Sequence, residues 1–142
     1  MVGPIFGTPR MGQSYNVQDC AYAVIKRENG DFAVARTPKG IVLLGGGVEN
    51  GESERDALYR EVYEESGYRA RILVRLGFAT QYINNSAKDK FRLKRATFFQ
   101  CELTEKIGPP VDQDHELLWL SYDKAHRKLL RPFHRWALEC VK

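Results

Sequence analysis

The sequence predicts an α/β domain with a mixed β-sheet and helices packed against it. Segments rich in β-branched and aromatic residues alternate along the chain with segments of helical character. The chain has 142 residues, the length of one ordinary domain, and 43% of them are hydrophobic, which suffices for a normal core. No internal repeat or long linker interrupts the pattern. One domain spanning residues 1–142 is therefore expected.

The first part of the chain is predicted to form strands joined by tight turns. Residues 1–18 are rich in glycine and proline and are expected to be irregular, with at most a short edge strand. Residues 20–26 predict a strand, Asn29-Gly30 indicates a hairpin turn, and residues 32–36 are expected to return as the partner strand. After a further turn, residues 41–44 form a short strand that leads into three consecutive glycines.

A change of period then predicts a helix over residues 53–66. Ser53 is a suitable N-cap, because its hydroxyl can accept a hydrogen bond from the first helical turn. Glu54 and Asp56 place negative charge at the positive end of the helix dipole, and Gly67 suits its C-terminal end.

The remaining elements follow from the same reasoning. Residues 71–82 and 94–103 predict two longer strands, and the polar, charged segment 83–93 between them is expected to be a loop at the rim of the sheet. Residues 107–115 contain two consecutive prolines and are predicted to form another loop. The last expected elements are a strand at 116–120 and helices at 121–128 and 132–141.

Residues 44–68 combine a glycine-rich loop with a helix that carries clustered acids. Glu61, Glu64 and Glu65 stand at i, i+3 and i+4, so their side chains leave the helix on one side. Three carboxylates so close repel one another, and a hard cation such as Mg²⁺ or Mn²⁺ would offset the repulsion. Arg60 stands beside them and is expected to pair with a carboxylate such as Glu52. Alternatively, the glutamates form an ordinary solvated helix face, a reading that the preceding glycines disfavour.

The same segment resembles the signature of the MutT/Nudix family. Eight of the signature's nine constrained positions match, and Tyr68 stands where the family usually has an aliphatic residue. Leu44 occupies a place where proline is common. The nine positions are Gly46, Glu52, Arg60, Glu61, Val62, Glu64, Glu65, Gly67 and Tyr68. The resemblance implies an α/β/α sandwich with a mixed sheet and a loop-helix-loop catalytic motif.

The resemblance also implies an activity, namely hydrolysis of a pyrophosphate bond in a nucleoside di- or triphosphate derivative with Mg²⁺ or Mn²⁺ as cofactor. It makes the metal ligands Glu61, Glu64, Glu65 and a backbone carbonyl near Gly46. Glu61 or Glu65 is also a candidate base, while Glu52 and Arg60 are expected to orient the ligands. In several relatives the base comes from a later loop. The alternative bases here are Asp114 and Glu116.

Substrate contacts are expected from the segment between the two long strands. Its basic residues Lys88, Lys90 and Arg92, which Lys94 and Arg95 follow, could grip additional phosphates, and Tyr82 could stack on a base. The alternative is a solvated basic loop and an aromatic residue that packs at the rim. On the last predicted helix, His134 and Trp136 are expected to be packing and surface residues.

The sequence also admits other functions. The run of acids and the basic segment faintly resemble diphosphoinositol polyphosphate hydrolases, and a dinucleoside polyphosphate hydrolase is a further alternative. A non-catalytic nucleotide-binding module is less favoured, because all the box glutamates are present. The net charge of +4 suits an anionic partner, but no motif supports nucleic-acid binding.

The expected partner is therefore a small phosphoanhydride substrate. No apolar run is long enough for a membrane span, and the N-terminus lacks the features of a secretory signal, so a cytoplasmic protein is expected. Three widely spaced cysteines are expected to be reduced thiols. Relatives are often dimers, and a homodimer is one expectation for this chain.

Overall fold

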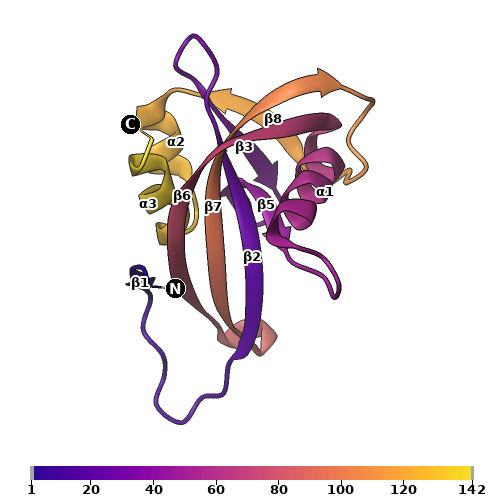
Figure 1. The fold of residues 1–142 in the computed structure, drawn as a ribbon. Coiled ribbons are helices and arrows are strands. Elements are labelled where there is room, and N and C mark those ends of the chain that lie inside the picture. The colour runs from indigo at the N-terminus through magenta and orange to yellow at the C-terminus, as the bar shows by residue number, and fades with distance from the viewer. Residues whose placement is uncertain (1, 142) are drawn as a thin grey trace.

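The structure, a computed structural model, describes residues 2–141 and contains two β-sheets flanked by helices (Figure 1). The larger sheet has the order β1 (Ile5–Phe6), β6 (Tyr68–Asn85), β7 (Lys90–Lys106), β2 (Asn16–Ile25) and β5 (Leu44–Gly47). The smaller sheet has the order β4 (Gly40–Val42), β3 (Phe32–Thr37) and β8 (Glu116–Leu120). The helices are α1 (Glu54–Ser66), α2 (Tyr122–Lys128) and α3 (Pro132–Glu139), and a single 3₁₀ turn spans Ser86–Lys88.

The larger sheet is mixed, as the sequence predicts. Strand β2 runs parallel to β7 and antiparallel to β5, and β6 and β7 form a long antiparallel ribbon. Helix α1 covers one face and α2 and α3 lie over the other (Figure 1). Strand β2 is apolar on both sides for this reason: Tyr22 and Val24 belong to the core beneath α3, whereas Ala23 and Ile25 belong to the core beneath α1. The predicted α/β sandwich is confirmed.

Helix α1 begins and ends where local chemistry predicts. The Ser53 hydroxyl accepts a hydrogen bond from the backbone N–H of Asp56 at 3.1 Å, and the Asp56 carboxylate accepts one from the backbone N–H of Ser53 at 3.2 Å. Gly67 ends the helix with a φ of 77°, in the left-handed region. A Cβ atom at that position would lie 2.0 Å from the carbonyl oxygen of Gly108, so a side chain there is excluded by sterics as well as by backbone angle.

The expected hairpin of residues 20–26 and 32–36 forms only at its tip. Gly30, with a φ of 91°, turns the chain, and the backbone N–H of Arg27 donates to the carbonyl of Asp31 at 3.0 Å. Beyond a single bridge between Lys26 and Phe32 the two strands separate into different sheets. The prediction that they pair along their length is wrong, because each strand has a stronger partner elsewhere: β2 pairs with β7, and β3 pairs with β8.

The prediction of a loop over residues 83–93 is also wrong, because most of this segment belongs to two strands. Strand β6 continues to Asn85 and β7 starts at Lys90, which leaves only a short turn that contains Asp89 at a φ of 51°. The two strands pair residue by residue from Tyr82 and Leu93 to this turn. Polar residues on a paired strand imply that one of its faces is not part of the apolar core.

The N-terminal segment and the last elements agree with expectation. The short edge strand is β1, α2 is capped by the hydroxyl of Ser121, and Pro132 occupies the first turn of α3. All three cysteines are free thiols. Among residues 2–141, no helix combines the length and apolar character that crossing a bilayer requires.

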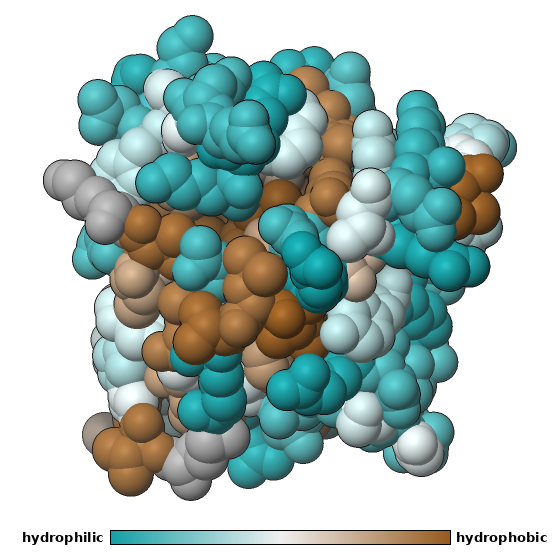
Figure 2. Space-filling model, turned by 45° about the horizontal axis from the view of Figure 1, so that its top comes forward, coloured by the Kyte–Doolittle hydropathy of each residue, from teal (hydrophilic) through white to brown (hydrophobic). Residues whose placement is uncertain are grey.

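Some apolar surface remains uncovered. Figure 2 shows one face of the molecule, where hydrophobic residues gather near the middle and hydrophilic residues surround them. On β6, Leu73 and Val74 each keep half of their surface exposed, and β1 pairs with this strand only at Thr80 and Gln81. Homodimers often bury surfaces of this kind. The homodimer stays a prediction.

Candidate active site

The glutamates of α1 lie against the glycine strand β5. A Cβ atom at Gly46 would lie 2.8 Å from the carboxylate carbon of Glu61, so only glycine lets Glu61 approach the strand this closely. The backbone N–H of Gly45 donates to Oε1 of Glu65 at 3.0 Å. The glycine run therefore holds two of the three predicted carboxylates against the backbone of β5.

Arg60 links the acidic residues of the site. Its Nε and Nη2 atoms donate to the two oxygens of Glu52 at 2.7 and 2.9 Å, and Nη1 donates to Glu61 and Glu64 at 2.9 and 3.0 Å. It also reaches the backbone carbonyl of Gly47 at 3.0 Å. These hydrogen bonds lower the pKa of Glu52 to about 2 and raise the pKa of Arg60. The expected pair of Arg60 with Glu52 is present.

The loop after β7 adds two residues that the sequence reasoning missed. The backbone N–H of Asp112 donates to the carbonyl of Glu64 at 2.8 Å, which folds the loop onto the end of α1. One ligand atom each from Glu61, Glu64 and Asp112 lie within 4.8 Å of one another, and the same holds for Glu65, Asp112 and His115. The sequence indicates only that Asp112 and His115 are possible metal ligands in a loop that contains two prolines, and nothing in it places them near the glutamates.

The electrostatics of this group fit a divalent cation. Glu65 is 4% exposed, and burial raises its pKa and that of Glu61, where the hydrogen bond from Arg60 opposes the effect. The donor set consists of carboxylate oxygens with one imidazole, His115, whose Nδ1 atom is buried without a hydrogen-bond partner. Oxygen donors of this kind suit Mg²⁺ and Mn²⁺, and the imidazole is a better ligand for Mn²⁺ than for Mg²⁺.

The two alternative bases lie in different places. Asp114 lines the cavity next to the glutamates. Glu116 points elsewhere, since its carboxylate pairs with Arg36 on β3 at 3.2 Å and both side chains are more than half exposed. The structure therefore brings Asp112 to the cluster in place of Glu116.

A cavity of about 360 Å³ extends from the glutamate cluster. Its lining includes residues close to the glutamate cluster, namely Gly45, Gly46, Glu65, Asp114 and His115, together with Tyr22, Lys94, Arg131 and His134. His134 therefore lines the cavity as well as packing in the core. Trp136 packs against Gly77, as a packing role predicts.

The basic residues expected to contact the substrate lie on opposite faces of β7. Lys90, Arg92 and Lys94 stand at every second position of β7 and share one face, and Lys94 lines the cavity. Arg95 faces the other way and pairs with Asp19 at 2.9 Å.

Two further predicted contacts lie outside the cavity. Lys88 lies in the turn between β6 and β7. Tyr82 lies against Tyr15, with ring centroids 5.1 Å apart, and is not among the described residues that line the cavity.

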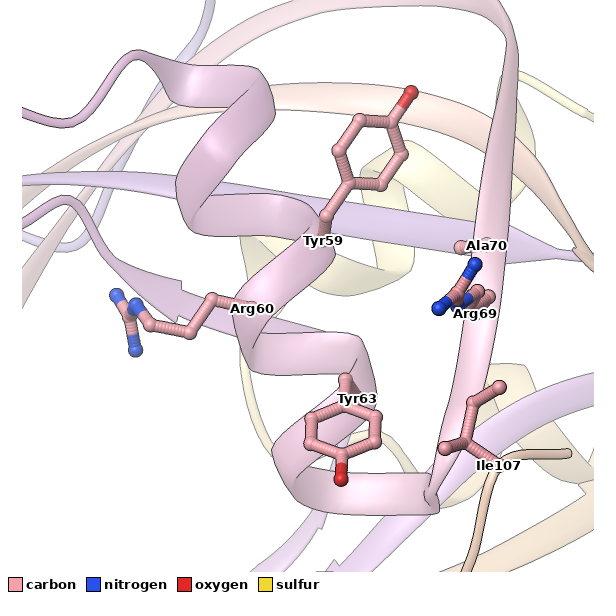
Figure 3. A pocket seen from close by; sticks show the side chains of 6 residues that line it. All are labelled: Tyr59, Arg60, Tyr63, Arg69, Ala70 and Ile107. Atoms are coloured by element: carbon pink, nitrogen blue, oxygen red, sulfur yellow. The ribbon is translucent and has the colours of Figure 1, made fainter.

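A separate hollow lies between α1 and the start of β6 (Figure 3). Tyr59 and Tyr63 flank it on the helix, and Arg69, Ala70 and Ile107 face them. Arg60 lines the hollow as well, but in Figure 3 its side chain extends away from these facing residues. None of the box glutamates lines this hollow, so it is distinct from the candidate site.

Comparison with known proteins identifies the family. The model of the NUDIX domain family matches residues 17–139. The chain belongs to the NUDIX domain family. The expectation of a MutT/Nudix protein is confirmed, and residues 46–68 are its Nudix box.

One curated relative and many solved structures resemble the chain. It is 32% identical over 96 residues to an 8-oxo-(d)GTP phosphatase of Mycolicibacterium smegmatis, a match that covers 68% of this chain and 28% of that longer protein. A NUDIX hydrolase from Nitrosomonas europaea has a TM-score of 0.73 at 20% identity, with 87% of each chain covered. A MutT NUDIX hydrolase from Burkholderia pseudomallei has a TM-score of 0.68 at 24% identity, covering 89% of this chain and 99% of that one. These structural likenesses support the Nudix fold.

Proposed function

We propose that the protein hydrolyses a pyrophosphate bond in a nucleoside di- or triphosphate derivative, with Mg²⁺ or Mn²⁺ as cofactor. The observation that supports this most strongly is the convergence of Glu61, Glu64 and Asp112 within 4.8 Å in a member of the Nudix family. Glu65 joins the group on its buried side. All the box carboxylates are present, which favours an enzyme over a nucleotide-binding module.

In this proposal Glu61, Glu64, Glu65 and Asp112 hold the metal, and His115 supplements them. A bound divalent cation neutralises phosphate charge and polarises the bond that is cut. Arg60 fixes the orientation of the Glu61 and Glu64 carboxylates through its hydrogen bonds, and Glu52 fixes the Arg60 guanidinium in turn. The backbone of Gly45 and Gly46 borders the same cavity, where the substrate phosphates would approach.

The base is proposed to be one of the carboxylates that borders the cavity. Glu65 is the most buried of the box glutamates and accepts a hydrogen bond from the backbone N–H of Gly45, which fixes its orientation at the cavity. Asp114 lines the same cavity from the loop side. Separate Gln or Asn variants of the two residues, compared by the pH dependence of kcat, identify the one that accepts the proton.

The substrate proposed for the first test is an oxidised guanine nucleoside triphosphate, 8-oxo-dGTP. The 8-oxo-(d)GTP phosphatase relative supports this choice, and its matched segment is about a quarter of its length. The cytoplasmic location and the absence of a nucleic-acid partner remain proposals alongside it.

The deciding experiment is a hydrolysis screen over nucleotide substrates, including 8-oxo-dGTP, with Mg²⁺ and with Mn²⁺. Released phosphate and pyrophosphate are both measured, which identifies the bond that is cut. Glu64→Gln should lower kcat at least about a hundredfold, while Glu105→Gln, at an exposed position on β7, serves as the matched control. Wild-type turnover by Glu64→Gln, or no turnover of any nucleotide, would contradict the proposal.

A further inference from the structure

Cations also line the cavity that Glu65 borders. Lys94 and Arg131 both line it and are half-buried, and Arg92 lies two residues before Lys94 on the same face of β7. Within residues 2–141, neither Lys94 nor Arg131 forms a side-chain hydrogen bond or an ion pair. Charged groups in such a position normally have a counter-ion.

The surroundings of Lys94 do not compensate its charge. Burial lowers the pKa of Lys94, and repulsion from Arg131, Arg92 and Lys39 lowers it further, while the Cys20 thiol acts in the opposite direction. The burial of Arg131 lowers its own pKa, and the charge of Arg92 lowers it further, while Tyr22 acts in the opposite direction. Like charges are therefore held together at a cost in stability.

His134 adds a hydrogen-bond donor at the same place. It is 1% exposed, and its Nδ1 atom accepts a hydrogen bond from the backbone N–H of Leu43 at 3.3 Å. The ring proton consequently lies on Nε2, an atom that is buried and has no hydrogen-bond partner. Burial, together with the charges of Lys94 and Arg131, lowers the pKa of His134 well below 6.5, so the ring is neutral at pH 7.

These three side chains offer donors and positive charge but no acceptor. A neutral ligand would satisfy Nε2 of His134 and leave the charges of Lys94 and Arg131 uncompensated. An oxyanion satisfies all three, because it carries negative charge and several acceptor atoms. The box glutamates need a cation instead, so the two groups of residues select different parts of one ligand.

We infer that Lys94, Arg131 and His134 bind an oxyanion of the substrate, a phosphate group beyond the pyrophosphate bond that the glutamates and their metal hold. This inference rests on the proposed function. The phosphate has two possible sources: the terminal phosphate of a nucleoside triphosphate, or a phosphate monoester on the ribose of a nucleoside diphosphate derivative. Lys88 lies in the turn before β7 and Lys90 at the start of β7, and the inference does not require either of them to contact this phosphate.

The first test is binding of inorganic phosphate to the full chain without added divalent metal, measured by calorimetry and by the thermal unfolding midpoint. Lys94→Met should raise the dissociation constant for phosphate about tenfold or more. In chloride buffer the same variant should unfold at the same or a higher temperature than wild type, because an uncompensated charge has been removed. Lys94→Arg should retain binding.

The matched control is Lys124→Met, which removes an exposed lysine from α2. It should bind phosphate as wild type does. A purely structural role for Lys94 predicts the opposite pattern, a lower unfolding temperature with unchanged phosphate affinity. That pattern, or wild-type phosphate affinity in a folded Lys94→Met variant, would overturn the inference.

The second test identifies the source of the phosphate from ratios of kcat/KM. One ratio compares a nucleoside triphosphate with its diphosphate, and the other compares coenzyme A with dephospho-coenzyme A, which lacks one phosphate monoester. Lys94→Met should reduce the ratio for the correct source about tenfold and leave the other unchanged. If both ratios keep their wild-type values, the inference is wrong.

The two tests separate this inference from the proposed function. Phosphate binding that depends on Lys94, in a protein that hydrolyses no nucleotide, would refute the proposed function and support the anion site. Hydrolysis with unchanged ratios and unchanged phosphate binding in Lys94→Met would support the function and refute the anion site.

Discussion

Substitution of Gly46 by alanine tests whether the approach of Glu61 to β5 matters for activity. The added Cβ would lie 2.8 Å from the Glu61 carboxylate carbon, and ordinary contact begins at 3.4 Å, so the carboxylate must retreat by about 0.6 Å or more. The obstacle is the end of a flexible side chain, and Gly46 has no positive φ, so the fold should tolerate the change.

The cost should therefore fall on catalysis. Displacement of a reacting group by about 1 Å can lower a rate about a hundredfold, and a shift of this size predicts a loss of about ten- to a hundredfold in kcat. The assay is hydrolysis of the best nucleotide in the screen at saturating Mg²⁺, with the thermal unfolding midpoint measured in parallel.

Two other glycines supply the controls. Gly108→Ala meets no atom within 4 Å and should keep both activity and stability. Gly45→Ala should unfold the protein, because its Cβ would lie 2.3 Å from the carbonyl oxygen of Ala21 at a φ of 139°. If Gly46→Ala retains the wild-type kcat, the close contact with Glu61 has no catalytic importance.

Three further predictions concern the support of the site. Arg60→Lys should lower the apparent affinity for Mn²⁺, measured by titration, about ten- to a hundredfold. The reason is that a lysine cannot hydrogen-bond to both oxygens of Glu52 and also reach Glu64. An unchanged Mn²⁺ affinity would contradict a positioning role for Arg60. The pKa of Glu52 is about 2 in the folded state, against 4.5 for an ordinary glutamate, so the stabilisation it provides is complete above pH 4.5 and is lost as the pH falls toward 2. The difference in unfolding midpoint between wild type and Glu52→Gln should therefore shrink as the pH falls over that range. A difference that stays constant would refute the pairing of Glu52 with Arg60 as the source of this stabilisation. Ser53→Ala should lower the free energy of unfolding by about 1 kcal/mol in urea denaturation, and a loss near zero would mean that the capping box contributes little.

The parts of the site that the sequence predicts are those with local signals. The limits of α1 follow from the Ser53 cap and the Gly67 stop, and the spacing of the glutamates places them on one side of the helix whatever the rest of the chain does. Asp112 could not be found in this way. Its position depends on a backbone hydrogen bond to Glu64, between segments with no local relation to one another.

The errors in the predicted strands have related causes. Asn29-Gly30 does turn the chain, but a turn signal cannot report that β2 pairs with β7, far along the sequence. The polar stretch 83–93, which contains Lys90 and Arg92, was expected to be a loop because strands usually carry an apolar face. In the folded protein Lys90 and Arg92 share a face of β7 with Lys94, which lines the cavity, so this face is not part of the apolar core and its polar residues fit a strand.

Two groups of charged residues at the candidate site place opposite demands on one ligand. Around Glu61, Glu64 and Glu65 the protein concentrates negative charge, and around Lys94 and Arg131 it concentrates positive charge, yet Glu65 and Lys94 line the same cavity. Ion pairs between the two groups would compensate both charges, but within residues 2–141 neither Lys94 nor Arg131 forms an ion pair. A polyphosphate with its metal carries both complementary charges in one chain. The presence of both unpaired cations and clustered carboxylates at one site is therefore better explained by such a substrate than by the stability of the fold.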